Sequence, residues 1–299
     1  MAILVNKEEK SPPSNERALV KFKESVEKQG FFVEFITKDD ASRINEFDAL
    51  FIRATTSVNH FTYKIARKAE SEGLVVIDDS SSILKCANKV YLAELLRNAK
   101  IETPKTLIIH SDNKNEVVET LGLPCILKLP DSSFSVGVVK VSTLEELNDT
   151  LKKMLEQSEL LIGQSYMPTD FDWRIGVIDG KAFYACKYFM ARGHWQIYNW
   201  SSGNKEDIIG DFETLEISNV PVNIISMAEK ATALIGSGLY GVDLKESNGK
   251  VVVIEINDNP SIDFGVEDLI DKDLVYDKII GRIKRKVMSR ATNEKYDYV

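Results

Sequence analysis

The stretch GVDLKESNGKVVVIEIN, residues 241–257, predicts two β-strands joined by a turn. Its middle residues Asn248-Gly249 form a dipeptide that often closes a hairpin, and apolar runs lie on both sides of it. Because successive side chains of a strand point to opposite faces, each strand has one apolar and one polar face. The apolar positions are even-numbered on both strands: Val242, Leu244, Ile254 and Ile256.

The register of this hairpin decides which polar side chains meet. For the two apolar faces to coincide, paired residues must both be even-numbered or both odd-numbered. That register requires a loop with an odd number of residues or a β-bulge, rather than a two-residue turn. It brings Asp243, Glu255 and Asn257 together on one polar face. Three oxygen-bearing side chains without a nearby His or Cys are typical of a site for a hard cation such as magnesium.

The alternative for this segment is an ordinary half-exposed hairpin whose polar residues face water. The turn Asp258-Asn259-Pro260-Ser261 continues the polar cluster past the end of the second strand. Because functional sites tend to lie on loops held by a rigid scaffold, this turn favours the metal site.

The composition excludes several classes of function. The chain has 299 residues, 43% of them hydrophobic, so it can bury a sizeable core in one assembly or in two to three lobes. Its formal net charge of -8 argues against binding to nucleic acid or to an anionic membrane, because no basic excess exists to neutralise phosphates. Neither a signal-peptide core nor an apolar run of membrane-spanning length occurs, which predicts a cytoplasmic protein.

The cysteines and histidines do not form a recognisable site. Cys86, Cys125 and Cys186 lie far apart without a Cys-x-x-Cys pair, which predicts reduced, buried thiols. The three histidines are equally scattered, so neither a transition-metal cluster nor a nucleophile–histidine pair is indicated. The chemistry is therefore expected to rest on lysine, arginine, aspartate, glutamate and asparagine.

Three blocks follow one another along the chain. Residues 1–84 alternate short apolar strands with helices, which predicts a Rossmann-like parallel sheet, yet no Gly-x-Gly-x-x-Gly motif follows the first strand. Residues 85–160 predict a small α+β lobe with a hairpin around a serine-rich turn. Residues 161–299 predict several strands, a long helix, the 241–257 hairpin and a final helix.

Two lysines interrupt apolar segments of the second block. Lys89 lies on a predicted helix and Lys128 lies within a predicted strand. A buried ammonium group is costly unless it is paired, so a phosphate partner would explain both, although each alone also suits a lysine whose charged end reaches solvent. The turn 131–137 after Lys128 supplies hydroxyls and backbone N–H groups that could wrap a phosphate; the alternative is a mobile polar hairpin tip.

Read in order, these segments resemble the ATP-grasp superfamily over nearly the whole chain. The motifs are Lys89, Lys128 with its serine-rich loop, Gln164-Ser165-Tyr166-Met167, Asp172-Trp173-Arg174, Asp243 and Glu255-x-Asn257. The closest resemblance is to RimK-like carboxylate-amine ligases, which are related to glutathione synthetase. It implies an α/β fold with an N-terminal Rossmann-like parallel-sheet domain and two α+β lobes that clasp ATP.

The resemblance also implies roles for individual residues. The residues expected to bind ATP are Lys89, Lys128, Ser132, Ser133, Ser135, Gly137, Gln164, Ser165, Tyr166, Met167 and Asp172. Asp243, Glu255 and Asn257 would hold two magnesium ions, for which manganese can substitute. Arg174 and Lys187 would lie near the transferred phosphate, Arg192 and Asn199 near the acyl phosphate or acceptor, and Arg53 near the acceptor substrate.

Two departures from the family pattern are visible. The phosphate loop contains only Gly137 where relatives usually carry several glycines. The region expected to carry an Arg-x-Asn and a Gly-Gly instead reads RGHWQIYNWSSG, residues 192–203. Its aromatic residues Trp195, Tyr198 and Trp200 suit either a substrate wall or a loop packed over the lobe.

The implied reaction needs no side-chain nucleophile. A carboxylate attacks the γ-phosphate of ATP, an acyl phosphate forms, and an amine displaces phosphate. The substrates would be an amino acid, a peptide or a protein tail, with glutamate addition as one possibility, and a homo-oligomer is compatible with the family. The alternatives are an ATP-grasp phosphotransferase and a non-catalytic nucleotide-binding protein.

Overall fold

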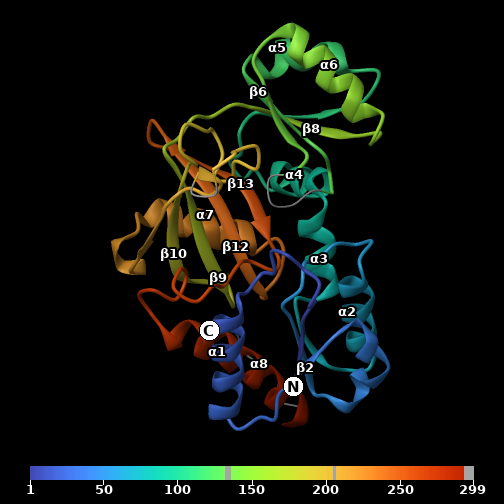
Figure 1. Cartoon of the computed structure of the whole chain (residues 1–299), viewed down its shortest axis with the longest axis vertical. Coiled ribbons are helices and arrows are strands. Elements are labelled where there is room, and N and C mark those ends of the chain that lie inside the picture. The colour runs from blue at the N-terminus through green and yellow to red at the C-terminus, as the bar shows by residue number, and fades with distance from the viewer. Residues whose placement is uncertain (132–135, 205–206, 293–299) are drawn as a thin grey trace.

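The computed structural model describes residues 1–131, 136–204 and 207–292 and shows three bodies along the long axis of the molecule (Figure 1). A small lobe from the middle of the sequence lies at one end. The N-terminal domain, accompanied by the last helix, lies at the other end, and a five-stranded sheet lies between them.

The N-terminal domain is built on a parallel four-stranded sheet with the order β2-β1-β3-β4. The alternation of short strands and helices in residues 1–84 correctly predicts this arrangement. Its elements are β1 (Ala2–Leu4), α1 (Glu16–Lys28), β2 (Glu34–Ile36), the 3-10 helix η1 (Lys38–Glu46), β3 (Ala49–Ile52), α2 (Phe61–Ser71), β4 (Val75–Ile77) and α3 (Ser80–Ala87).

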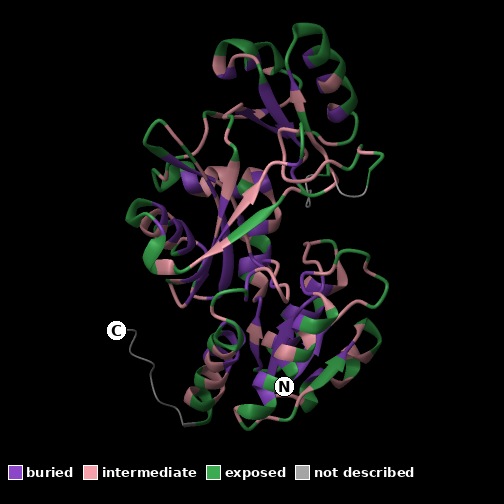
Figure 2. Ribbon diagram, turned by 60° about the vertical axis from the view of Figure 1, so that its left-hand side comes forward, coloured by how far each residue is buried: buried purple, intermediate pink, exposed green. Residues whose placement is uncertain are grey.

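Both faces of this sheet are buried. Ile3 and Phe51 belong to a core that includes α1 and the last helix, α8 (Asp273–Thr292), whereas Leu4 and Leu50 pack with α2 and η1 on the opposite face. The period of two therefore distributes neighbouring residues between two cores. Figure 2 shows this concentration of buried residues in the strands.

The central lobe carries a four-stranded antiparallel sheet with the order β5-β8-β6-β7. Two helices cover one face, where Cys125 and Leu127 contribute to a separate core. Ile126 and Lys128 alternate with them and therefore face away from the helices. The elements are α4 (Lys89–Asn98), which leads into the lobe, β5 (Thr106–Ile109), η2 (Lys114–Glu116), α5 (Val117–Leu121), β6 (Cys125–Lys128), β7 (Val138–Val141), α6 (Leu144–Leu155) and β8 (Leu161–Ser165).

The C-terminal sheet has five antiparallel strands in the order β11-β10-β9-β12-β13. Helix α7 packs against one face of it. Helix α8 leaves this body and packs beside α1, so the C-terminal and N-terminal regions share one hydrophobic core. The elements are β9 (Phe171–Ile178), β10 (Lys181–Phe189), β11 (Phe212–Leu215), η4 (Ile217–Asn219), α7 (Val222–Thr232), β12 (Leu239–Ser247) and β13 (Lys250–Asn257).

Two elements do not follow the boundaries expected at residues 84/85 and 160/161, and one predicted helix is divided. Helix α3 crosses the first boundary. Strand β8 follows the second boundary but pairs with β5 and β6, so the central sheet extends to Ser165. The predicted continuous helix from Ser81 to Ala99 is two helices, because the side chain of Asn88 caps a new helix by accepting hydrogen bonds from Val90 N and Tyr91 N.

The hairpin of β12 and β13 contains both a two-residue turn and a β-bulge. Asn248 and Gly249 have positive φ angles of 52° and 74°, as expected for a type I′ turn. The register shifts by one residue after Asp243, which pairs with Glu255. The predicted bulge is confirmed, whereas the expectation that it would replace the two-residue turn is wrong.

The bulge also changes the role of Ile254. This residue has no partner in the strand register and lies in the wall of a cleft, and Val253 replaces it in the core against α7. The predicted apolar position of Ile254 is therefore wrong, because the extra residue reverses the alternation on one side of the bulge.

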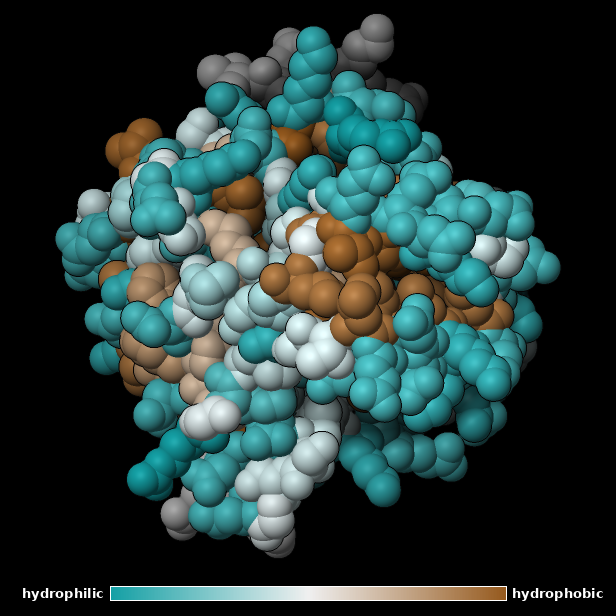
Figure 3. Space-filling model, turned by 90° about the horizontal axis from the view of Figure 1, so that it is seen from above, coloured by the Kyte–Doolittle hydropathy of each residue, from teal (hydrophilic) through white to brown (hydrophobic). Residues whose placement is uncertain are grey.

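Seen from the end formed by the central lobe, the surface is mainly hydrophilic, with apolar side chains gathered near its middle (Figure 3). None of the helices in the described part of the chain combines the length and the apolar character needed to cross a membrane.

Candidate active site

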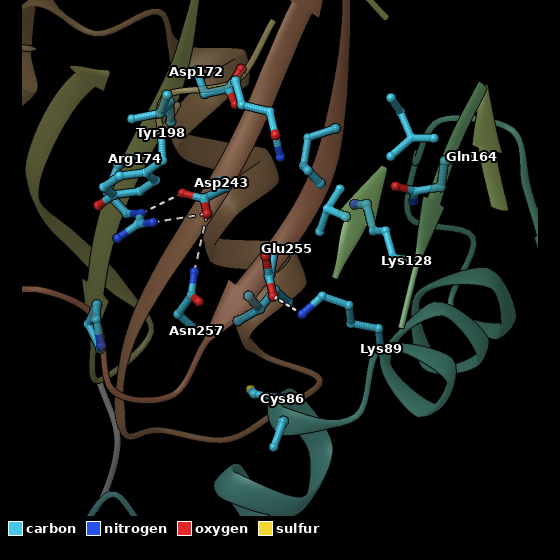
Figure 4. A pocket seen from close by; sticks show the side chains of 18 of the residues that line it. Cys86, Lys89, Lys128, Gln164, Asp172, Arg174, Tyr198, Asp243, Glu255 and Asn257 are labelled. Atoms are coloured by element: carbon cyan, nitrogen blue, oxygen red, sulfur yellow. Dashed lines mark hydrogen bonds and ion pairs between the residues drawn. The ribbon is translucent and has the colours of Figure 1, made fainter. Parts of the chain in front are cut away.

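The candidate active site is a cleft where the three bodies meet (Figure 4). Ile126 and Lys128 line it from the face of β6 that points away from the helices of the central lobe. The polar face of β12 and β13 forms the opposite wall. Loops that follow β1, β3 and β13 close the end of the cleft beside the N-terminal domain.

Asp243, Glu255 and Asn257 converge on this wall, as the hairpin predicts. Asp243 pairs directly with Glu255 across the two strands. The side-chain amide of Asn257 donates a hydrogen bond to Asp243 Oδ2 at 3.2 Å. The polar face therefore presents two carboxylates and one amide to the cleft (Figure 4).

Lys89 and Glu255 form an ion pair across the cleft. Lys89 Nζ lies 2.7 Å from Glu255 Oε1. Burial alone opposes ionisation of Glu255, but the nearby charges of Lys89 and Lys128 outweigh it and hold the pKa of this carboxyl below its ordinary value. The glutamate is consequently ionised at neutral pH.

Lys128 is a buried ammonium group that has no hydrogen-bond or ion-pair partner within the described ranges. It is 9% exposed and its side chain points into the cleft (Figure 4). Burial lowers its pKa to about 8, and the charge of Glu255 opposes this shift. A desolvated cation in a cleft is well suited to an anionic ligand, since the ligand would supply the missing partner.

Arg174 binds both carboxylate oxygens of Asp243. Its Nε donates to Asp243 Oδ1, and its Nη2 donates to Oδ2 at 3.0 Å. Behind this pair, the guanidinium lies 5.5 Å from the centre of the Tyr188 ring, whose hydroxyl donates to the buried Glu267. A polar chain thus runs from Glu267 through Tyr188 and Arg174 to Asp243.

A second buried ion pair joins β9 and β12. Lys245 Nζ donates to the carboxylate of Asp172 and, at 2.6 Å, to Thr169 Oγ1. Burial raises the pKa of Asp172, and the attraction of Lys245 opposes that shift. The sequence places Lys245 on the polar face of β12 with Asp243, and this shared face is the signal from which a role in the site could have been predicted.

The segment Gln164-Ser165-Tyr166-Met167 lines the cleft where β8 leaves the central lobe. Gln164 is 8% exposed and donates to Thr106 Oγ1 at 3.2 Å, and Tyr166 N donates to Pro124 O. These contacts fix the segment that connects the two lobes, the place where the resemblance expects adenine to bind.

Arg53 is buried among the loops at one end of the cleft. It is 1% exposed, and its guanidinium donates to Ser14 Oγ, Asn259 Oδ1 and the carbonyl oxygens of Pro13 and Pro260. The structure thus places Arg53 outside the lining of the cleft, and its contact with a substrate stays an untested prediction. The residue instead joins the loops that follow β1 and β13 to the end of β3.

Three further expected residues lie outside the lining of the cleft. Lys187 pairs with Glu213 at 2.8 Å and lies beside the rings of Phe171 and Trp173. Arg192 is exposed, and the backbone N–H of Asn199 donates to Ile208 O. The structure therefore does not bring Lys187, Arg192 or Asn199 to the site.

The serine-rich loop is described only at its ends. Ser132, Ser133 and Ser135 lie outside the described residues. Asp131 lines the cleft and accepts a hydrogen bond from Asn88 Nδ2 at 2.9 Å. Gly137 has a φ of 71°, a backbone conformation that residues other than glycine rarely adopt. It is not among the residues that line the cleft.

The aromatic segment forms part of the cleft wall. Trp195 and Tyr198 line the cleft, and Trp195 packs edge-on against Tyr166 with their ring centres 6.2 Å apart. Trp200 stacks on Tyr198 at 5.3 Å but is half exposed. The sequence left two interpretations open, a wall of the substrate site and a loop packed over the lobe. Trp195 and Tyr198 fit the first because they line the cleft, and Trp200 fits the second because it does not.

The side chains of Asp243, Glu255 and Asn257 supply oxygen atoms of the kind that bind magnesium. Glu255 Oε2 and Asn257 Oδ1 accept no hydrogen bond from the described residues, so both oxygens remain available for a cation. Asp243 would share its carboxylate between the ion and Arg174. Magnesium sites commonly use one or two carboxylates together with substrate phosphates, so a small protein donor set is sufficient.

The polar chain behind Arg174 leads to a prediction about pH. Burial raises the pKa of Glu267 from 4.5 to about 7, so between these pH values the unfolded chain releases a proton that the folded protein keeps. The folded state therefore loses about 3 kcal/mol relative to the unfolded state as pH rises through this window. Glu267→Gln should remove this loss, so the Tm difference between variant and wild type should become more positive from about pH 5 to about pH 8. A Tm difference that is constant with pH would contradict the assigned ionisation.

The fold and this cleft define an ATP-grasp enzyme, and comparison with known proteins extends the assignment. The model of the RimK-like ATP-grasp domain matches residues 86–280, so the chain belongs to the RimK-like ATP-grasp family. It is an ATP-dependent carboxylate-amine ligase.

Its curated relatives carry consistent names. The probable alpha-L-glutamate ligase of Hydrogenovibrio crunogenus is 25% identical over 253 residues, which cover 83% of this chain and 80% of the relative. A probable alpha-L-glutamate ligase of Chromohalobacter salexigens is 26% identical over 235 residues, with coverage of 77% and 74%.

Solved structures share the fold over almost the whole length. A D-alanine–D-alanine ligase from Bacillus anthracis superimposes with a TM-score of 0.74 at 19% identity, covering 99% of this chain and 100% of that one. A RimK domain ATP-grasp protein from Sphaerobacter thermophilus gives a TM-score of 0.70 at 15% identity, covering 95% and 100%.

Proposed function

We propose that this chain activates a carboxylate as an acyl phosphate with ATP and then joins it to an amine. The carboxylate and the amine belong to an amino acid, a peptide or a protein tail. Because curated relatives are named probable alpha-L-glutamate ligases, glutamate addition is the first reaction to assay.

The observation that carries this proposal is the charge balance of the cleft. Among the described cations that line it, Lys89, Arg174 and Lys245 are each paired with a carboxylate. Lys128 lacks such a partner in the described part of the chain. A polyphosphate bound beside β6 would provide one, and charge-assisted contacts of this kind are among the strongest hydrogen bonds.

The positions of the other lining residues suggest how a nucleotide would lie in the cleft. The segment from Gln164 to Met167 would contact adenine, and Lys128 and Lys89 would contact the phosphates. Asp243, Glu255 and Asn257 would hold magnesium, with manganese as a substitute. Bound there, the metal would neutralise charge on the transferring phosphoryl group.

The reaction then follows from charge and position. An oxygen of the substrate carboxylate bonds to the γ-phosphorus as the bond to ADP breaks, which gives the acyl phosphate. The amine nitrogen next bonds to the carbonyl carbon, the bond to phosphate breaks, and the nitrogen loses a proton to solvent. Lys128 and Arg174 line the cleft, and their positive charges would favour both steps by stabilising the negative charge that develops on the phosphoryl group.

Product analysis tests this proposal. We expect release of ADP and phosphate only when a carboxylate and an amine are both supplied with ATP and magnesium. Hydroxylamine supplied as the amine should trap the acyl phosphate as a hydroxamate. A stable phosphorylated product without any amine would instead indicate a phosphotransferase, and tight ATP binding without turnover in any mixture would indicate a nucleotide-binding protein.

A further inference from the structure

The cleft has a second end, formed by loops of the N-terminal domain. Thr55, Thr56 and Ser57 follow β3, and 258–261 follow β13. These loops lie at the carboxyl edge of the parallel sheet, where ligands of open α/β sheets usually bind. Lys128 lines the other end of the cleft, beside the central lobe. The central lobe and the N-terminal domain lie at opposite ends of the molecule (Figure 1).

No cationic side chain lines this second end within the described ranges. The lining cations are Lys89, Lys128, Arg174 and Lys245. All four belong to α4, the central lobe or the C-terminal sheet. Arg53 is the cation nearest in sequence, but it is buried and its donors contact neutral oxygens of other loops. Among the described residues, a ligand carboxylate would therefore find hydroxyl groups here but no cation that lines the cleft.

The charged group that does line this end is Asp258. It is 5% exposed, and its Oδ2 has no hydrogen-bond partner in the described part of the chain. Thr56 is its side-chain hydrogen-bond partner. A buried carboxylate with an unpaired oxygen is destabilising, and a positively charged ligand beside it would offset part of that cost.

A neighbouring carboxyl group makes this end more favourable to a cation. Asp78 follows β4, is 1% exposed, and has no hydrogen-bond partner for either oxygen within the described ranges. Its charge interacts with that of Asp258. Two adjacent buried carboxyl groups disfavour a further negative charge, so this end suits a positively charged ligand better than a negatively charged one.

We propose that Asp258 binds the ammonium group of the amine substrate, and that this end of the cleft selects a primary amine without a carboxylate next to it. The proposal rests on the proposed ligase function and deepens it by assigning the amine to the N-terminal-domain end. It concerns the bound substrate before the amine loses the proton required for attack. A free α-amino acid such as glutamate would be disfavoured as the amine, because its own carboxylate would meet no described cation at this end, so glutamate in the first assay would enter as the carboxylate substrate.

Two matched probes test this inference without knowledge of the natural substrate. Pentylamine and norleucine have the same carbon chain, but norleucine carries a carboxylate beside the amine. The full chain loaded with magnesium and ADP would be titrated with each probe at constant ionic strength, and the rise in Tm would give the affinity. We expect pentylammonium to bind more tightly than norleucine; equal or tighter binding of norleucine, or no binding of pentylammonium, would overturn the proposal.

A variant locates the contact. Asp258→Asn should weaken pentylammonium about tenfold or more, because a charge-assisted hydrogen bond is lost. Asp112→Asn, which makes the same charge change at an exposed site on the central lobe, should leave the affinity unchanged. Unchanged pentylammonium binding in Asp258→Asn would overturn the proposal. If this variant does not fold, the relative affinities of the wild type for pentylammonium and norleucine still test the proposal.

The response to magnesium and ADP separates this inference from the ligase function itself. A stabilising shift by magnesium and ADP in wild type and Asp258→Asn, together with failure of the amine tests, would reject only the ammonium site. Absence of that shift in the wild type would reject the nucleotide site and the inference that rests on it.

Discussion

Glu255→Ala is expected to abolish turnover while the protein remains folded. Glu255 offers Oε2 to a cation and holds Lys89 through Oε1, so the substitution removes a proposed magnesium ligand and the partner of a lysine in the same cleft. Loss of a metal-ligand carboxylate should reduce kcat by roughly a thousandfold or more, since a metal contributes several kcal/mol of transition-state stabilisation. Steady-state release of ADP and phosphate measures the effect.

The control is a glutamate on the same hairpin. Glu246 on β12 is exposed, so Glu246→Ala should retain turnover. Glu255→Gln keeps the shape of the side chain and one oxygen that can accept from Lys89, and it should also be inactive but close to wild type in Tm. Activity in Glu255→Ala, or unfolding of Glu255→Gln, would indicate that this residue serves the structure rather than the metal.

Lys128→Met is expected to weaken ATP binding and to stabilise the protein without nucleotide. The lysine is buried, and no described residue pairs with it, so its ammonium group lowers stability until a phosphate arrives. Loss of a charge-assisted contact should reduce ATP affinity by about ten- to a hundredfold. Calorimetric titration with ATP and magnesium measures the affinity, and the Tm without nucleotide measures stability.

The pH dependence of the stability gain follows from the lowered pKa of Lys128. The ordinary pKa of a lysine is 10.5, and burial lowers that of Lys128 to about 8. Below about pH 8 the buried side chain is charged and destabilises the folded protein fully, and this destabilisation decreases as the pH rises and the side chain loses its proton. The gain in Lys128→Met should therefore be largest at neutral pH and shrink in alkali. Lys114→Met, at an exposed position, should change neither quantity. Unchanged ATP affinity in Lys128→Met would refute the proposed phosphate contact.

Local patterns correctly predict much of the fold and part of the site. Alternation in the 241–257 hairpin places Asp243, Glu255 and Asn257 together, and alternation in β6 explains why Lys128 faces the cleft while Leu127 faces the helices. The parallel N-terminal sheet also follows from the order of its elements. These features depend on the spacing of residues within one or two neighbouring elements.

The features that the sequence did not predict have both distant and local causes. Arg53 is buried because loops around Pro13 and Pro260 close over it, and neither loop is adjacent to it in the sequence. The helix of the second block is interrupted because Asn88 caps α4, a position that apolar periodicity does not reveal. Lys187 lies on the α7 face of β10, together with Ala185, and pairs there with Glu213 on the neighbouring strand.

The shared core explains why the predicted boundaries do not separate independent bodies. Helix α8 lies at the end of the sequence but packs with Phe22 of α1 and Phe51 of β3, and the ring centres of Phe22 and Tyr276 are 4.8 Å apart. The central lobe, in contrast, has its own core. Hydrophobic periodicity predicts α8 but not the sheet that it covers.

The central claim is that the cleft binds a nucleotide through magnesium, and a thermal-shift titration tests it most directly. Wild-type protein would be titrated with ATP, ADP and GTP, each with and without magnesium, because a ligand that binds only the folded state must raise its apparent stability. We predict a magnesium-dependent shift that is larger for the adenine nucleotides than for GTP. No shift at millimolar nucleotide would contradict the account.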